Sequence, residues 1–351
     1  MFDYAIVGAG AAGVVLALKL KEKGRSVKLY DKDGVLEGAS SVAGAFFSPK
    51  LGKNYPLDKL INSSLLHSLR FFETHFFDCL DKRGVLMLPK KSKGGEEKFR
   101  EYEEYIELPF EIKESGDLLK QREEGYFFKD GAILDVWKLK KKIENTIEFE
   151  QKNIDSYSKI EAKNIILTTG VQTELLPEYI DITPVYGHRL ECLSEQECGF
   201  NLNGDISLSA TRKRGSFAIG ATHHRSQEEY KKDGGKKLIK SAKELLGFEF
   251  KIENILGGAR ATSKDHFPII GRVADVDEVR KLDSRYLHSK RWSSEKLKYI
   301  DGVYLLNGLG ARGFVYAPLC ADILIEHIEK KSPIPRELDS DRLLFRYFRK
   351  R

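Results

Sequence analysis

The sequence predicts an α/β protein in which two domains are interleaved along the chain, and three observations support this prediction. The chain opens with an apolar strand, a glycine-rich turn and a helix. A similar strand, glycine-rich turn and helix recur close to the C-terminus. The segments between them alternate between nucleotide-fold patterns and short strands with antiparallel spacing. We therefore expect a Rossmann-like nucleotide-binding domain that is interleaved with an α+β domain built on an antiparallel sheet.

The opening segment has the pattern of a dinucleotide-binding unit. Residues 4–7 form an apolar run, residues 26–30 form a second strand that closes on Asp31, and a helical pattern lies between them. The turn before that helix has the spacing Gly-x-Gly-x-x-Gly, at Gly8, Gly10 and Gly13. Glycines let the backbone approach a pyrophosphate, the helix N-terminus offers partial positive charge, and the acidic residue can accept a hydrogen bond from a ribose. This pattern suits NAD as well as FAD.

The remaining elements follow from hydrophobic periodicity. We expect helices where apolar side chains recur at helical spacing, over residues 56–77, 135–148, 227–246 and 318–330. We expect strands over residues 84–89, 149–154, 164–168, 183–193, 205–211, 216–222 and 303–306. The nucleotide-binding domain is expected over residues 1–80, 129–182 and 257–335, and the second domain over residues 81–128 and 183–256. Residues 336–351 are expected to form a basic C-terminal tail.

The composition argues against membrane and disulfide-stabilised classes of protein. The chain has 351 residues, 41% hydrophobic and 32% charged, and no apolar run approaches the roughly 20 residues that span a bilayer. The first residues already read as a strand without a secretory leader, so we expect a cytoplasmic protein. The four cysteines lie far apart, at Cys79, Cys192, Cys198 and Cys320. This spacing predicts no disulfide framework, no metal site and no covalent attachment of a flavin.

The basic residues are unevenly distributed. Lysine and arginine number 59 against 53 aspartates and glutamates, which gives a net charge of +6. Residues 278–298 hold seven basic and three acidic residues, and the last six residues hold four bases around Tyr347 and Phe348. Such clusters suit a polyanionic partner, although a solvated lysine-rich surface explains them equally well.

Two further segments favour FAD over NAD. Residues 38–44 are small, as is required where backbone lies against a bulky bound group, although a flexible loop has the same composition. Residues 307–314 join a strand to a helix through the second glycine-rich turn. A helix N-terminus aimed at the cofactor would stabilise the negative charge that a flavin ring gains on reduction.

Taken in order, these motifs resemble a known family. The opening unit, GASSVAGAFFSPKL, IILTTG, GARATSKDHFPIIG and LLNGLGARGFVYAP resemble the D-amino acid oxidase and glycine oxidase superfamily of FAD enzymes over nearly the whole chain. More narrowly, ATSKDHFPIIG, GLGARGFVYAP and the ending DSDRLLFRYFRKR resemble the oxidase half of the bifunctional tRNA wobble-uridine enzymes called MnmC. The resemblance implies a GR2-type FAD-binding domain with non-covalent FAD.

The resemblance also implies an activity. In that family the FAD enzyme removes the carboxymethyl group from 5-carboxymethylaminomethyl-(2-thio)uridine at the wobble position of tRNA, giving 5-aminomethyl-(2-thio)uridine and glyoxylate. The family also carries a methyltransferase domain ahead of the oxidase, whereas this chain begins at the FAD motif. We therefore expect tRNA as the substrate and a separate methyltransferase for any methylation that follows.

The resemblance assigns roles to individual residues. Arg260 matches the arginine that pairs with the substrate carboxylate, although a structural ion pair is the other interpretation. Arg312, His266 and Tyr186 are further catalytic candidates, and for His266 a local hydrogen bond that fixes its turn is favoured over catalysis. The residues expected to contact FAD are Gly8, Gly10, Ala12, Gly13, Asp31, Lys32, Ala39, Ser40, Ala43, Gly44, Ile154, Thr169, Gly170, Gly308, Gly310, Ala311, Arg312, Gly313 and Phe314.

Two alternatives remain at this point. A metabolic amine oxidase acting on glycine, sarcosine or a D-amino acid would need the same FAD motifs and Arg260, but would have no use for a basic, aromatic tail. A tRNA-binding or scaffolding protein with a vestigial flavin site is the second alternative. The intact glycine turns and Arg260 argue against it.

Overall fold

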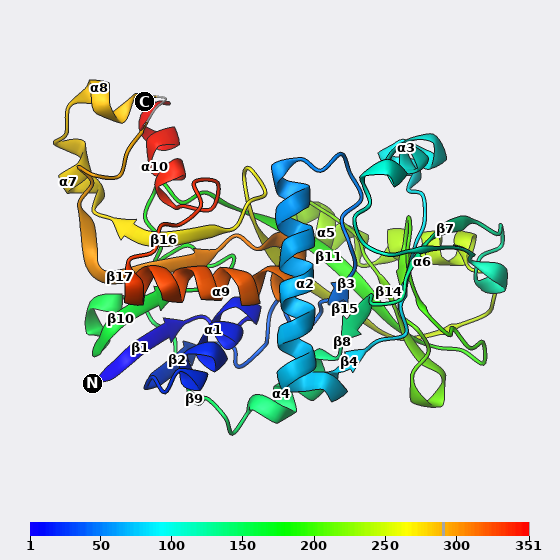
Figure 1. Cartoon of the computed structure of the whole chain (residues 1–351). Coiled ribbons are helices and arrows are strands. Elements are labelled where there is room, and N and C mark those ends of the chain that lie inside the picture. The colour runs from blue at the N-terminus through cyan, green and yellow to red at the C-terminus, as the bar shows by residue number, and fades with distance from the viewer. Residues whose placement is uncertain (290–291, 351) are drawn as a thin grey trace. The chain divides into compact units, whose positions relative to one another are not determined.

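The structure, a computed structural model, describes residues 1–289 and 292–350 (Figure 1). The chain divides into two compact units, each built from separate segments. Unit 1 comprises Met1–Ser40, Lys140–Pro184 and Arg260–Arg351, and unit 2 comprises Ser41–Leu139 and Val185–Ala259.

Unit 1 is built on a six-stranded sheet with the strand order β16-β17-β10-β1-β2-β9. These strands are β1 (Phe2–Val7), β2 (Val27–Asp31), β9 (Glu148–Gln151), β10 (Ala162–Leu167), β16 (Ile269–Ala274) and β17 (Tyr299–Asn307). All neighbours are parallel except β16 and β17, which pair in antiparallel fashion. Helices α1 (Ala11–Glu22) and α9 (Gly313–Lys330) pack against each other, as Figure 1 shows. This is the nucleotide-binding architecture that the opening motif predicts.

The C-terminal segment is part of the core of unit 1, so the expectation of a basic tail is wrong. It forms α10 (Asp341–Phe348), whose Leu343, Leu344, Phe345 and Phe348 belong to one buried cluster with Val7, Leu167 and Leu305 of the sheet. The helix is amphipathic, and it packs next to β16. Two short helices, α7 (Val276–Arg280) and α8 (Ser284–Leu287), pack around the same core through Val279 and Leu287.

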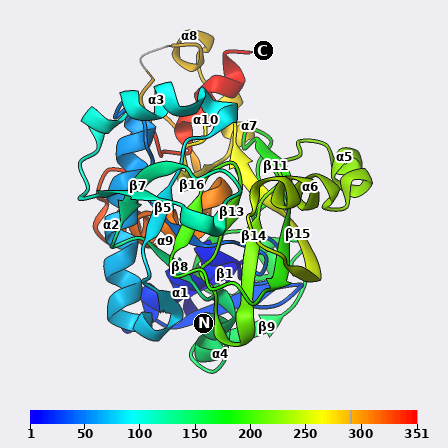
Figure 2. The ribbon, with the colours of Figure 1, turned by 90° about the vertical axis from the view of Figure 1, so that its right-hand side faces the viewer.

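Unit 2 is built on an eight-stranded sheet with the order β15-β11-β14-β13-β12-β5-β7-β6. Its strands are β5 (Val85–Met87), β6 (Glu111–Glu114), β7 (Glu124–Phe128), β11 (Ile182–Leu193), β12 (Asn201–Asn203), β13 (Ser207–Leu208), β14 (Ser216–Gly220) and β15 (Lys251–Ser263). The pairs β11–β14, β14–β13, β13–β12, β5–β7 and β7–β6 are antiparallel, and β12 and β5 pair in parallel. In Figure 2, α5 (Gln227–Asp233) and α6 (Lys236–Leu245) lie close to the β14–β15 part of this sheet.

A small second sheet completes unit 2. Its strands are β3 (Phe46–Phe47), β4 (Leu80–Asp81) and β8 (Ala132–Leu134), in the order β3-β8-β4. The remaining helices are α2 (Pro56–Phe76), α3 (Gly95–Glu101) and α4 (Val136–Ile143), the last of which continues into unit 1. Short 3₁₀ turns lie at Phe77–Cys79, Lys91–Lys93, Glu103–Tyr105, Gly116–Leu118, Tyr157–Lys159, Lys213–Gly215 and Gly310–Arg312.

The fold class predicted from the sequence is confirmed, and the differences concern boundaries and missed strands. Residues 41–80 and 129–139 lie in unit 2, because β3 and β4 both pair with β8 and cannot be separated from it. The helix expected over residues 227–246 is two helices, since Gly234 (φ 53°) and Gly235 (φ 87°) both adopt the left-handed conformation between them. Among the described residues, no helix combines the length and apolar character needed to cross a membrane.

Candidate functional site

The first glycine turn in unit 1 is packed too tightly for side chains. Gly8 has φ 109°, and a Cβ atom there would lie 2.3 Å from the carbonyl oxygen of Thr168. A Cβ atom on Gly13 would lie 1.9 Å from the carbonyl oxygen of Gly8. The backbone of β1, β10 and α1 can approach this closely only because both residues are glycine. At the first turn of α1, the N–H of Ala11 donates to Ser40 Oγ at 3.0 Å.

Asp31, at the end of β2, is held rigidly next to this turn. Its Oδ2 accepts from the backbone N–H of Ala9 at 2.7 Å, and its Oδ1 accepts from the N–H of Asp33 at 2.8 Å. Each carboxylate oxygen has two lone pairs, so both retain capacity to accept from a ribose hydroxyl. The position and the remaining acceptor capacity fit the role expected of this residue.

The second glycine turn lies beside the first one. A Cβ atom on Gly313, where α9 begins, would lie 3.4 Å from the Cβ atom of Ala11, where α1 begins. Two helix N-termini with partial positive charge therefore lie next to each other. Asn307 links this turn to the end of β10, since its Nδ2 donates to the carbonyl of Gly170 at 3.1 Å and its Oδ1 accepts from the N–H of Gly308 at 2.7 Å.

These segments of unit 1 form a cradle that fits a dinucleotide. Gly10 and Gly310 are partly exposed, and a Cβ atom would lie at an ordinary contact distance, 3.4 Å from Ser40 Oγ at the first and 3.6 Å from Thr262 Oγ1 at the second. Their backbones can therefore be approached by a bound group, whereas Gly8 and Gly13 are buried against the protein itself. The cradle lies where the parallel strands β1, β2 and β10 end, which is the edge at which open α/β sheets bind nucleotides.

The other predicted cofactor residues are distributed over both units. Those of unit 1 border the cradle or the strand ends, at Ala12, Lys32, Ala39, Ile154, Thr169, Ala311, Arg312 and Phe314. Phe314 is buried in α9, and Ile154 packs against the core of the sheet. Ala43 and Gly44 belong to unit 2, where the Ala43 carbonyl accepts from Arg189 Nη1 at 2.9 Å. The contacts of all these residues with FAD stay predictions.

Arg260 lies on β15, on the same strand face as a residue of the cradle. Thr262 forms a β-bridge with Leu309 in the second glycine turn. Arg260 lies two residues before Thr262 on the same strand. Because side chains two residues apart share a face of a strand, Arg260 points to the side on which Gly310 approaches Thr262. Burial lowers the pKa of the Arg260 guanidinium. A half-buried cation beside the cradle is suited to bind a carboxylate from a ligand.

His266 and its neighbour Asp265 lie in the turn that follows β15. His266 is exposed, has φ 66°, and donates its backbone N–H to the carbonyl of Ser263 at 3.2 Å. Asp265 pairs with Arg342 at 3.1 Å and with Arg346 at 3.1 Å, and these arginines hold the pKa of its carboxyl below the usual range although burial opposes them. Asp265 therefore anchors α10, a structural role that the sequence did not reveal.

Tyr186, in unit 2, lies in an aromatic and histidine cluster. Its backbone exchanges hydrogen bonds of 2.8 Å with His224 in both directions, and its ring lies 5.3 Å from that of Tyr230. Tyr230 also stacks on His188 at 4.3 Å. The sequence pointed to Tyr186 but missed His224, Tyr230 and Asp233, because these residues lie more than thirty positions further along the chain.

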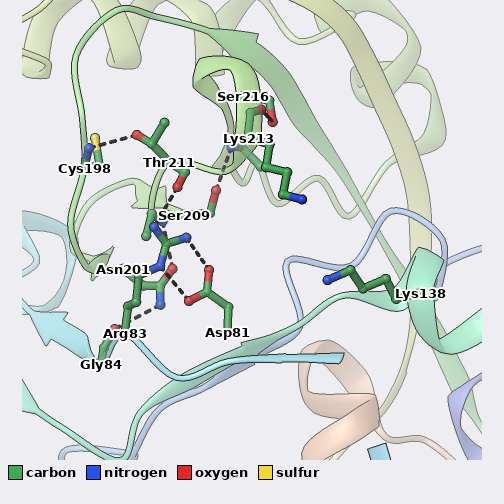
Figure 3. Close-up of polar contacts among 12 residues, drawn as sticks. Asp81, Arg83, Gly84, Lys138, Cys198, Asn201, Ser209, Thr211, Lys213 and Ser216 are labelled. Atoms are coloured by element: carbon green, nitrogen blue, oxygen red, sulfur yellow. Dashed lines mark hydrogen bonds and ion pairs between the residues drawn. The ribbon is translucent and has the colours of Figure 1, made fainter. Parts of the chain in front are cut away.

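A polar network in unit 2 presents a basic loop (Figure 3). Arg83 donates to both carboxylate oxygens of Asp81 and to the carbonyl of Thr211, and Thr211 Oγ1 accepts from the N–H of Cys198 at 2.8 Å. The network fixes the hairpin between β13 and β14, whose loop carries three consecutive cations, Arg212, Lys213 and Arg214. Within residues 1–289 and 292–350, none of these three cations forms an ion pair with a carboxylate.

In the part of the chain that the structure describes, three of the seven basic residues in the cluster expected over residues 278–298 form ion pairs. Arg280 pairs with Glu178 and Asp277, Lys281 with Glu278, and Arg285 with Asp283. Lys290 and Arg291, which are part of the same cluster, lie outside the described residues. This cluster therefore offers less free positive charge than its composition indicates.

Two proteins of the same name are similar to this chain over nearly its whole length. The chain is 24% identical over 390 residues to the tRNA 5-methylaminomethyl-2-thiouridine biosynthesis bifunctional protein MnmC of Shewanella amazonensis, covering 97% of this chain and 58% of that protein. It is 27% identical over 403 residues to the protein of the same name from Leptospira interrogans, covering 99% and 61%. The chain thus spans about three fifths of the length of these relatives.

Solved structures share the fold. Glycine oxidase from Bacillus cereus superposes with a TM-score of 0.73 at 16% identity, covering 95% of this chain and 96% of the other. Iminodiacetate oxidase from Chelativorans superposes with a TM-score of 0.66 at 17% identity, covering 95% and 98%. Residues 3–327, which contain the cradle, match the family described as FAD dependent oxidoreductase. The chain therefore belongs to the FAD dependent oxidoreductase family, and FAD is its cofactor.

Proposed function

We propose that this enzyme oxidises the CH–NH bond of the carboxymethylamino group on the wobble uridine of tRNA. The substrate is 5-carboxymethylaminomethyl-(2-thio)uridine, and the products are 5-aminomethyl-(2-thio)uridine and glyoxylate. What carries the proposal is the match of 97% of the chain to a relative whose name includes tRNA 5-methylaminomethyl-2-thiouridine biosynthesis. A separate methyltransferase that acts on the amine product is part of the proposal.

The chemistry requires positioning more than acid or base catalysis. The bound FAD would accept the hydride that leaves the methylene carbon of the glycine-like group, and the amine nitrogen would lose its proton as the C=N bond forms. The resulting C=N bond adds water, and cleavage of the C–N bond releases glyoxylate and leaves the amine on the nucleoside. An external electron acceptor then completes the cycle.

Arg260 is the residue that the proposal assigns to substrate orientation. Its planar guanidinium can bind both oxygens of the substrate carboxylate, which fixes the methylene carbon relative to the cradle. Restricting a reactant in this way lowers the entropic part of the barrier. Arg312, in the second glycine turn, is assigned a supporting role toward the negative charge of the reduced flavin.

Two groups of basic residues support the proposal that the substrate is a tRNA. In unit 2 the loop of Arg212, Lys213 and Arg214 carries cations without carboxylate partners among the described residues. In unit 1 the pKa of Lys350 is lowered by Lys264 and also by Arg346, which means that these cations lie close together. Cations in close groups favour binding of a phosphate backbone.

The test of the reaction is anaerobic reduction of the flavin. Purified enzyme is mixed with tRNA that carries the carboxymethylaminomethyl group, and in parallel with glycine, sarcosine and D-alanine, while flavin absorbance is followed. We expect fast bleaching by the tRNA. Bleaching by a small amine and not by tRNA would instead establish the second candidate, a small-molecule amine oxidase, which the shared fold with glycine oxidase favours.

The test of the RNA surface is charge reversal in the hairpin loop of unit 2. Replacing Arg212, Lys213 and Arg214 by glutamate should weaken tRNA binding and reduce the slope of log Kd against log salt by about 2–3. The matched control reverses three exposed cations of unit 2 that are already ion-paired, Arg122, Lys129 and Lys251. An equal loss in both variants would refute the assignment of the loop.

A further inference from the structure

Unit 2 contains a buried cluster of three side chains with the chemistry of metal ligands. His188 comes from β11, His224 from the segment after β14, and Asp233 from the last residue of α5. Asp233 Oδ2 lies 3.0 Å from His224 Nε2 and 3.4 Å from His188 Nδ1. One ligand atom from each residue lies within 4.8 Å of the other two, and all three residues are buried.

The two distances from the Asp233 carboxylate to the imidazole nitrogens fit a tetrahedral metal site. Zinc binds imidazole nitrogen and carboxylate oxygen at ~2.0–2.2 Å, so two ligand atoms of a tetrahedral site lie roughly 3.3 Å apart. The two distances from the Asp233 oxygen, 3.0 and 3.4 Å, lie on either side of this value. We propose that His188, His224 and Asp233 bind a divalent transition-metal ion, for which Zn²⁺ has the best-matched ligand preference.

The groups around the cluster hold Asp233 and His188 in place. The second oxygen of Asp233, Oδ1, accepts from the backbone N–H of Lys237 at 2.9 Å. The ring of His188 is stacked on Tyr230, with 4.3 Å between ring centroids and 14° between ring planes. The backbone N–H of His188 donates to Thr222 Oγ1 at 2.9 Å. Such contacts fix the direction of the ligating atoms before the metal binds.

The charges in the cluster favour a cation. Across the described parts of the chain, the ion pairs of Asp233 are with His188 and His224 alone, and the side chains of Asp233 and His224 are only 4% exposed. A buried carboxylate is costly unless a charged partner or a metal ion compensates it. A divalent ion bound by these three ligands compensates that charge. The fourth position is then open to water or to the Thr222 hydroxyl, which lies 3.1 Å from His188 Nδ1.

The position of the cluster gives the metal a structural role. His188 lies two residues from Tyr186 on β11, and His224 pairs with Tyr186 through the backbone. The metal would join β11, the segment after β14 and the junction of α5 with α6, which are distant in sequence. It would thereby fix the part of unit 2 that carries the aromatic pair Tyr186 and Tyr230. The sequence alone did not indicate these three ligands, because they are not grouped in a short motif.

The first test uses the wild-type holoenzyme. We expect one zinc per chain by elemental analysis, and after removal of the metal with a chelator we expect stoichiometric binding of Co²⁺ with the visible absorption bands of a four-coordinate site. A chelator should also lower the melting temperature. Absence of stoichiometric zinc together with absence of Co²⁺ binding would overturn the proposal.

A variant distinguishes a metal site from a hydrogen-bonded network. His224→Gln retains an N–H group that can donate to Asp233 but provides a poor metal ligand. We expect His224→Gln to bind Co²⁺ at least about tenfold more weakly, and the chelator to leave its melting temperature unchanged. The control is His223→Ala, which changes the exposed neighbouring histidine and should bind Co²⁺ like wild type.

The flavin content and circular dichroism of both variants establish that they are folded. If His224→Gln binds Co²⁺ as tightly as His223→Ala does, the three residues are not the ligands. In that case Asp233 simply accepts a hydrogen bond from each imidazole, and the metal proposal fails.

Discussion

At the scale of single residues, the sequence was sufficient to predict which glycines the turns require, but not which charged residues form ion pairs. Gly8 and Gly13 could be recognised because tight turns require glycine wherever a Cβ atom would collide with backbone, and the structure shows those collisions. The partners of Asp265 could not be predicted. Arg342 and Arg346 lie about eighty residues away, and only packing of α10 brings them together with this carboxylate.

Arg260 is the residue whose replacement tests the proposed carboxylate contact most directly. Arg260→Ala should retain FAD and lower kcat/KM on the modified tRNA by roughly 100-fold or more, because two charge-assisted hydrogen bonds are lost. Flavin absorbance and steady-state rates measure the two effects separately. The control is Arg285→Ala, whose side chain is 91% exposed. If Arg260→Ala and Arg285→Ala turn over equally fast, the contact does not exist.

Asp339 makes the stability of the protein depend on pH. Burial raises its pKa to about 7, and the nearby Asp341 carboxylate adds to the shift. The folded state therefore holds a proton that the unfolded chain releases above pH ~4, so the free energy of unfolding falls as pH rises from ~4 to about 7. Asp339→Asn stays neutral and should be more stable than wild type at pH 8, with a smaller difference at pH 5. Denaturant titrations at both values measure this, and a constant difference would contradict it.

At the scale of elements, the strong helical period of α2 was sufficient for its prediction, whereas the edge strand β15 was not predicted. Its sequence, KIENILGGARATS, contains two glycines and little alternation, and its position depends on pairing with β11. The helix α10 was wrongly predicted to be a tail, because the prediction rested on its basic residues and not on its apolar face of leucine and phenylalanine.

Adding one methyl group to the glycine turn before α1 should severely reduce FAD binding. Gly13→Ala forces a contact with the Gly8 carbonyl and should reduce the FAD content of the purified protein severely. Gly199→Ala is the matched control, because a Cβ atom there meets nothing within 4 Å. Absorbance of the purified proteins gives the ratio of flavin to protein. Full flavin content in Gly13→Ala would exclude the turn as the binding element.

The attachment of α10 through Arg342 should contribute strongly to the stability of unit 1. Arg342 donates to both oxygens of Asp265 and to the carbonyls of Leu338, Asp339 and Phe267. Arg342→Ala leaves the largely buried Asp265 with Arg346 as its cationic partner among the described residues and should lower the free energy of unfolding by about 3 kcal/mol. Arg349→Ala, at the exposed end of the helix, should have little effect. Similar losses in both variants would mean that the ion pair is not what anchors the helix.

At the scale of the whole molecule, the order of the elements along the chain has a consequence for synthesis. The middle of the sheet in unit 1 contains β17, which pairs with β10, and the cradle contains the start of α9. Both elements lie more than 270 residues after β1 and α1 in the sequence. A nascent chain that has not reached residue 299 therefore carries a β10 edge without its β17 partner and only one of the two glycine turns of the cradle. We expect such a chain to bind no flavin until β17 and α9 have been synthesised, and a fragment truncated before residue 299 to be colourless.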